Sequence, residues 1–146
     1  MQKGFIGKKV SARKRAKYQQ WIDENVSDEC MGDCARKSEA MAAQFPELRV
    51  VGTAAWYFQH AWCVDRKERV VDPTAHQFDG PFEYPGKEER LEKEDFPTSK
   101  CPECGDLTWP KTEGAKKYCE LTDQTFDHTA CYEAFGRVMN LDIILF

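Results

Sequence analysis

The sequence predicts an α+β fold in which N-terminal helices pack on a small antiparallel sheet. Apolar residues spaced three or four apart before residue 46 indicate helices, and stretches rich in β-branched and aromatic residues after it indicate strands. With 146 residues, of which 41% are hydrophobic and 32% charged, the chain can bury one main core and keep a water-exposed surface.

Two helices are expected at the start of the chain. Ser11 is a good N-cap for the first, which runs until the helix-breaking residues 25–28. Asp33 is a good N-cap for the second, which spans residues 34–45 and stops at Pro46. Cys34 then lies in the first turn of the second helix and points inward.

Three strands are expected next, over residues 48–51, 55–64 and 69–71. The polar residues 65–68 connect the last two strands as a hairpin, although this turn lacks the glycine that the tightest turns prefer. Beyond residue 78 the chain becomes rich in proline, glycine and charge, which predicts a linker over residues 79–100.

Composition limits the classes of function. The net charge of -4 argues against a surface that attracts nucleic acid everywhere, but residues 8–17 are strongly basic. This stretch is either a solvated helix face or a site for nucleic acid or an acidic partner. We expect no membrane contact and a cytoplasmic location, because the sequence shows neither an apolar signal segment nor a run of about 20 apolar residues.

The seven cysteines favour reduced-thiol chemistry over disulfides. Cys34 is the candidate nucleophile, because a helix N-terminus offers partial positive charge and free N–H groups that favour a thiolate. Taken alone, it could equally be a small buried hydrophobic residue. Cys30 and Cys63 are assigned to the structure.

His60 and Asp72 are the candidate base and its orienting carboxylate. Alternation along the strand puts His60, Trp62 and Val64 on one face, which we expect to meet the helix of Cys34. If residues 60 and 72 lie opposite each other, their Cβ atoms are about 5 Å apart, within reach of a hydrogen bond. A slip of one residue would separate them. Each could also be structural, His60 in the core and Asp72 at a turn before Pro73.

Short motifs in this region share their order with a known family. They are Gly32-Asp33-Cys34, residues 49–52, His60-Ala61-Trp62 and residues 71–74. Together they resemble the transglutaminase-like branch of the papain-like cysteine enzymes. The resemblance implies that residues 1–78 form a catalytic core with Cys34 as nucleophile, His60 as general base and Asp72 as orienter. It also implies hydrolysis of an amide or isopeptide bond, as in a peptidase, deamidase or amidase, on a protein or peptide substrate.

The C-terminal part, residues 101–146, has the spacing of a zinc knuckle with an apolar tail that packs on the core. Cys101 and Cys104, two residues apart and followed by glycine, can bind one ion. Cys119 and Cys131 are the best second pair, and His128 could replace Cys131. Four ligands leave no open position for substrate, so the zinc is expected to be structural.

The overall layout, with residues 45–48, residues 72–78 and the Cys-Pro-x-Cys-Gly motif at residues 101–105, also resembles small uncharacterised bacteriophage proteins. This likeness would place the chain in a host cytoplasm. The alternative function is a zinc-containing binding module for nucleic acid or a host protein, with an inactive triad.

The knuckle spacing predicts about one zinc ion per chain. Elemental analysis of protein purified without added metal or chelator measures this directly. A matched Cys101→Ser and Cys104→Ser variant should lose the ion, because it removes half of the thiolates. Wild-type protein without zinc would contradict the assignment.

Overall fold

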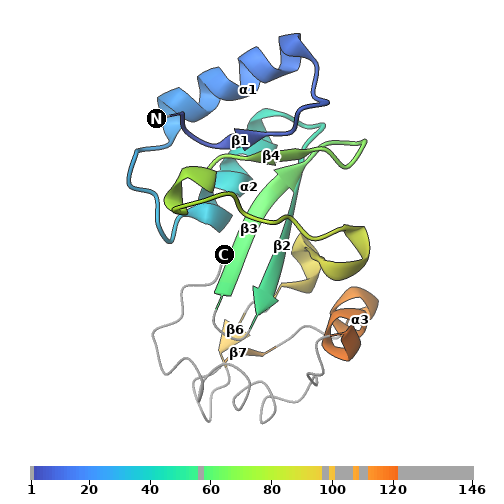
Figure 1. Ribbon diagram of the computed structural model, residues 1–146. Helices are drawn as coiled ribbons and strands as arrows, with labels where there is room; N and C mark the ends of the chain where they lie inside the picture. Colours follow the sequence, from blue (N-terminus) through green and yellow to red (C-terminus); the bar gives the residue numbers. More distant parts are fainter. Residues whose placement is uncertain (1, 56–57, 97–98, 101–106, 109–111, 122–146) are drawn as a thin grey trace. The chain divides into compact units, whose positions relative to one another are not determined.

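The computed structural model describes residues 2–55, 58–96, 99–100, 107–108 and 112–121 (Figure 1). These residues form two compact units, the first made of residues 2–51 and 60–84 and the second of the described residues in 52–59 and 85–121. Helices α1, α2 and α3 and a small five-stranded antiparallel sheet make the predicted α+β fold. None of the helices described here is long and apolar enough to span a membrane.

The sheet has the strand order β1-β4-β3-β2-β5. The strands are β1 (Phe5–Ile6), β2 (Arg49–Ala55), β3 (Phe58–Val64), β4 (Val70–Asp72) and β5 (Leu91–Glu92). A separate pair joins β6 (Ser99–Lys100) to β7 (Leu107–Thr108). The strand expected over residues 55–64 is divided differently, because Ala55 still belongs to β2 and β3 begins at Phe58.

Helix α1 (Ala12–Asn25) begins and ends where the sequence predicts. The Ser11 hydroxyl accepts a hydrogen bond from the Lys14 N–H at 3.3 Å and satisfies one of the free donors of the first turn. Tyr18 and Ile22, four residues apart, are buried on the inner face. The Tyr18 ring meets Phe45 edge to face at 5.0 Å, so α1 is held against the end of α2.

Helix α2 (Cys34–Gln44) follows a tight turn. The Asp33 N–H donates to the Cys30 carbonyl at 3.0 Å, and Gly32 between them has a φ of 85°, as the third position of a type II turn requires. The expected cap by Asp33 is wrong in one respect: its side chain makes no capping bond and instead pairs with Arg36.

Helix α2 packs on the face of β3 opposite to the predicted one. The Cys63 thiol donates to the Ser38 carbonyl at 3.3 Å, and the Ser38 hydroxyl donates to the Ala61 carbonyl at 3.4 Å. Trp62 and Val64 therefore point to the other face, where Phe82 and Tyr84 pack against Trp62. The expectation that α2 covers the Trp62 face is therefore wrong. The segment after residue 78 covers that face instead.

The stretch expected as a linker, residues 79–100, contains short elements of its own. It contains the short turns η2 (Lys87–Glu89) and η3 (Lys93–Asp95) as well as β5, and Leu91 and Phe96 are buried. These two apolar side chains lie within a highly charged stretch, so composition alone does not indicate that they are buried.

Helix α3 (Glu113–Leu121) begins against this stretch. Thr112 accepts from the Ala115 N–H at 3.1 Å, and its hydroxyl bonds to the buried Asp95 carboxylate. A Cβ on Gly114 would overlap that carboxylate, so a larger residue there would require the Asp95 side chain to move.

Gly4 gives a test of the core around β4. Its φ of 72° is left-handed, and an added Cβ would lie 2.8 Å from the Asp72 carbonyl oxygen and 3.0 Å from an Ile22 methyl. We expect Gly4→Ala to lower the free energy of unfolding by about 1–3 kcal/mol, measured by urea denaturation. The matched control is Gly80→Ala, because nothing lies within 4 Å of that Cβ. Equal stability of the two variants would contradict this account.

Candidate active site

The structure brings Cys34, His60 and Asp72 together. The His60 Nε2–H donates to Asp72 Oδ2 at 2.7 Å, and Cys34 lies close enough to the ring to contribute to the rise in its pKa. Cys34 is 4% exposed, and His60 and Asp72 are fully buried. Because Nε2 is engaged by Asp72, Nδ1 is the ring nitrogen that can face the sulfur.

The strand register differs from the expected one by two residues. Cys63 pairs with Val71, so Asp72 comes opposite Trp62 and diagonal to His60. The expectation that residues 60 and 72 lie directly opposite is therefore wrong. An offset of two keeps both side chains on the same face, since side chains alternate with a period of two. The longer diagonal is closed by the reach of the imidazole ring.

Asp72 is held by more donors than the sequence indicates. Besides His60, the Thr74 N–H donates to Oδ1 at 3.0 Å and the Tyr84 hydroxyl donates to Oδ2 at 2.6 Å. Burial, the charge of Asp72 and the hydrogen bond to Asp72 raise the pKa of the Tyr84 hydroxyl. Sequence reasoning missed Tyr84, because it lies in an irregular segment with no periodic signal. The Asp72-Pro73 pair, which favours an extended backbone, was the only local indication of a fixed carboxylate.

Aromatic rings enclose His60. Phe78 and Phe82 meet the imidazole edge to face with centroids 4.8 and 4.9 Å away, and Trp62 stacks on it at 5.7 Å. Tyr84 in turn packs against Phe82 at 4.8 Å. This wall excludes water, so charges inside it interact more strongly than they would in solvent.

The protonation of His60 reflects this environment. Burial alone would lower its pKa, but the charge and hydrogen bond of Asp72 outweigh burial, and Cys34 adds to them. Together they raise the pKa of His60 to about 9. At neutral pH the ring therefore carries a proton and a positive charge between a carboxylate and a sulfur.

The other described thiols are placed differently, in keeping with a structural role. Burial, followed by the charge of Asp72, raises the pKa of Cys30 to about 11, and burial also raises the pKa of Cys63. His76, 3.3 Å from the Cys30 sulfur, accepts from the Gly4 N–H at 2.9 Å and donates to the Ser27 carbonyl at 2.8 Å. The hydrogen bonds of His76 fasten loops, and burial keeps the two thiols protonated.

The expected zinc ligands cannot be placed. Cys101, Cys104, Cys131 and the alternative His128 lie outside the described residues, and Cys119 falls in α3 without a described side chain. Within the residues that are described, no group of three or more His, Cys, Asp or Glu could hold a metal ion.

Comparison with known proteins gives no match among family models, curated proteins or solved structures. The features that define the site are therefore the buried His60–Asp72 hydrogen bond and the position of Cys34 close to the imidazole.

Replacing Asp72 with Asn tests which interaction charges His60. Burial then dominates, and we expect the His60 pKa to fall from about 9 to below 6.5, measured by NMR titration of the ring protons. Tyr84→Phe is the matched control, because it keeps the carboxylate and should leave that pKa above 6.5.

The same shift has a consequence for stability. The pKa of His60 is higher in the folded protein than in the unfolded chain, so proton binding stabilises the folded state. This stabilisation is fully present below pH 6.5 and is lost as the pH rises through about 9. The Asp72→Asn variant should lack this decline between pH 6.5 and 9. An unchanged His60 titration in that variant would count against the ion pair.

Proposed function

We propose that the protein is a cysteine-dependent acyl-transfer hydrolase that cleaves an amide or isopeptide bond. Cys34 is the nucleophile, His60 the general base and acid, and Asp72 the residue that orients and charges the imidazole. The observation that carries the proposal is the buried His60–Asp72 hydrogen bond with Cys34 close to the imidazole, the sulfur being on the first residue of α2.

The first half of the reaction forms a thioester. The raised pKa of His60 favours the state in which the proton sits on the imidazole and the sulfur carries the negative charge. The thiolate attacks the amide carbon and forms a tetrahedral oxyanion. His60 gives its proton to the leaving nitrogen, the C–N bond breaks, and an acyl group remains on Cys34.

The second half restores the enzyme. Neutral His60 takes a proton from water, and the resulting hydroxide attacks the thioester carbon. The C–S bond breaks, the carboxylic acid leaves, and the thiolate and imidazolium are regenerated. Asp72 keeps its charge throughout, since its role is to hold the tautomer and to stabilise the imidazolium.

Two kinds of donor are available to the oxyanion. The first turn of α2 has backbone N–H groups without helical acceptors, and the helix dipole adds partial positive charge there. The Trp62 indole N–H is buried beside His60 and has no acceptor among the described residues, so it is a second candidate.

The family assignment belongs to the same proposal. The chain order Cys34, His60, Asp72 and the packing of α2 on an antiparallel sheet support a transglutaminase-like or papain-like core. A structural zinc unit over residues 101–146 would complete it. A protein or peptide is the proposed substrate class.

Cys34 should be the most reactive thiol of the zinc-loaded protein. Iodoacetamide at neutral pH should label it at least about tenfold faster than Cys30 or Cys63, because the raised pKa of each of those two leaves almost no thiolate. Peptide mapping by mass spectrometry measures the three rates separately. Cys34→Ala should abolish the fast reaction, whereas the matched Cys63→Ala should keep it.

Substrate turnover is tested on the same pair of variants. Intact-mass analysis after incubation with a cell lysate should show an acyl adduct on wild-type protein and on Cys63→Ala, but not on Cys34→Ala. Fast labelling at Cys30 or Cys63 in place of Cys34 would overturn the nucleophile assignment.

A further inference from the structure

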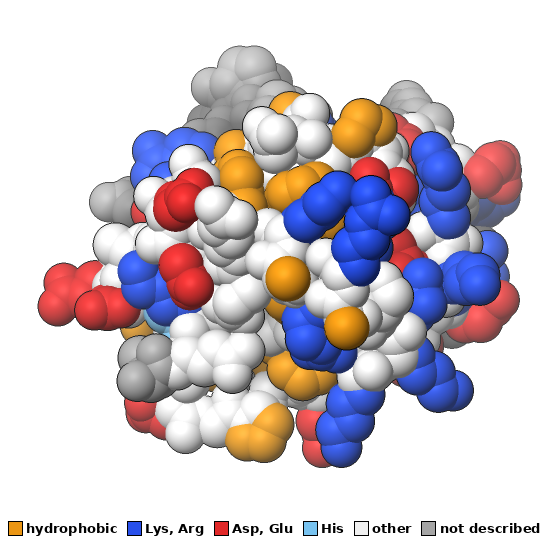
Figure 2. Space-filling view, turned by 90° about the horizontal axis from the view of Figure 1, so that it is seen from above, with side chains coloured by type: hydrophobic (Ala, Val, Ile, Leu, Met, Phe, Trp, Pro, Cys, Tyr) orange, Lys and Arg blue, Asp and Glu red, His pale blue; other side chains and the backbone are white. Residues whose placement is uncertain are grey.

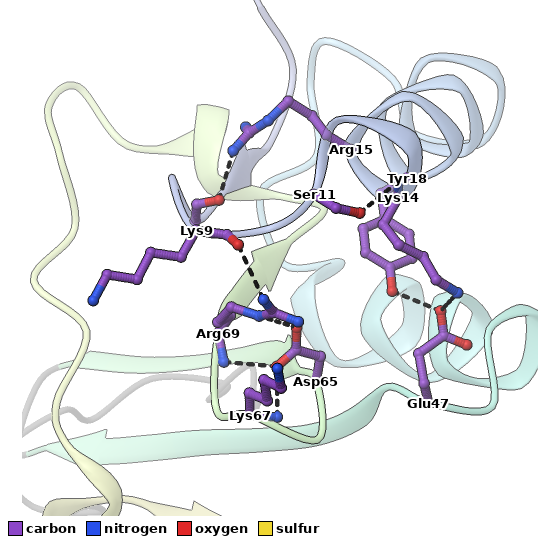
Figure 3. A network of polar contacts seen from close by, with 10 residues as sticks. Lys9, Ser11, Lys14, Arg15, Tyr18, Glu47, Asp65, Lys67 and Arg69 are labelled. Atoms are coloured by element: carbon purple, nitrogen blue, oxygen red, sulfur yellow. Dashed lines mark hydrogen bonds and ion pairs between the residues drawn. The ribbon is translucent and has the colours of Figure 1, made fainter.

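A strongly basic surface is assembled from two segments of the first unit. The turn before α1 carries Lys8 and Lys9, and the Arg69 guanidinium of the β3–β4 turn donates to the Lys9 carbonyl at 3.0 Å (Figure 3). A cavity beside this contact is lined by both segments and by the residues that follow α2. Its lining residues are Val10, Lys14, Tyr18, Glu47, Asp65, Arg66, Lys67 and Arg69.

The first of the two carboxylates in this cavity is engaged from within the fold. Glu47 Oε2 accepts from Lys14 Nζ at 2.7 Å and from the Tyr18 hydroxyl at 2.6 Å. Burial would raise the pKa of Glu47, but these bonds and the Lys14 charge lower it to about 2. The negative charge of Glu47 therefore neutralises the positive charge of Lys14.

The second carboxylate, Asp65, organises the β3–β4 turn. It accepts from the Lys67 and Arg69 backbone N–H groups, each at 2.9 Å, and from Arg69 Nε at 2.6 Å. Burial opposes ionisation, yet these bonds lower the pKa of Asp65. Asp65 compensates Arg69, and the turn presents Arg66 and Lys67 to solvent.

The remaining cations form what we call the basic rim. It consists of Lys8, Lys9, Arg13, Lys17, Arg66 and Lys67. All six are exposed, and none is in an ion pair within the described part of the chain. Figure 2 shows Lys and Arg side chains gathered on the right, the side on which Figure 1 places the start of α1 and the β3–β4 turn. In a chain of net charge -4, such a rim is a pronounced local concentration of positive charge.

We propose that the basic rim binds the phosphate backbone of a nucleic acid. A duplex carries one negative charge per about 1.7 Å of its axis, so it can satisfy several cations of one rim together. A membrane fits less well, because the exposed large hydrophobic residues among those described, Phe5 and Met31, belong to neither rim segment and offer it no apolar anchor.

The binding needs no thiol chemistry, since no rim residue takes part in the site at Cys34. A Cys34→Ala variant should therefore bind as wild type does. Failure of this proposal and failure of the hydrolase proposal are consequently separate results.

Fluorescence anisotropy with labelled 30-base-pair DNA and labelled single-stranded RNA tests the rim and distinguishes the two sources of phosphate. We expect binding to at least one probe to weaken at least about tenfold between 50 and 200 mM salt, because phosphate contacts release counterions. Arg66→Glu with Lys67→Glu should weaken binding about tenfold more and reduce the slope of log K against log salt by about two.

The matched control is Lys87→Glu with Lys116→Glu, which makes the same change of net charge on exposed residues of the second unit. It should leave affinity within about twofold. Lys8→Glu with Lys9→Glu, on the other rim segment, should repeat the loss, which guards against a local folding defect at the turn. Equal loss in the control, salt-independent binding, or tighter binding of an oligoglutamate peptide or of anionic vesicles would overturn the proposal.

Discussion

The buried carboxylate of Asp72 is the constraint on which the first unit depends. A carboxylate without water must be matched by donors and by an opposite charge, or it costs several kcal/mol. The protein meets this need with the Thr74 N–H, the Tyr84 hydroxyl and the His60 imidazole. Since β4 lies between β1 and β3, its backbone is fixed from both sides: Asp72 pairs with Phe5 of β1, and Val71 pairs with Cys63 of β3. The charge on His60 is thus a consequence of folding.

Local chemistry explains how much of the fold could be predicted. Ser11 caps α1, and Gly32 provides the left-handed turn before α2, both readable from residue type. The register of β3 and β4 could not be predicted, because Glu68, with a φ of 65°, occupies a position where a glycine would have been the signal. Asp65 supplies the missing turn geometry through its own hydrogen bonds.

The candidate active site could likewise be predicted only in part from the sequence. Cys34 begins a helix, His60 lies in an alternating strand and Asp72 precedes a proline. Each of these patterns can be recognised locally, so the three residues could be selected from the sequence. Tyr84 and the aromatic wall could not be selected in this way. Tyr84 lies twelve residues after Asp72 in an irregular segment, which has no periodic pattern that would predict the contact. The face covered by α2 was missed for the same reason: the competing cover comes from residues that composition marks as a linker.

The two proposed activities of the first unit depend on groups that titrate in different pH ranges. With a pKa of about 2, Glu47 stays ionised across the neutral range and keeps its bonds to Lys14 and Tyr18 beside the basic rim. His60 loses its proton at about pH 9, and with it the charge that favours the thiolate. Ionised carboxylates support both sites, but the chemistry at Cys34 also depends on the His60 proton, so alkaline conditions remove the chemistry.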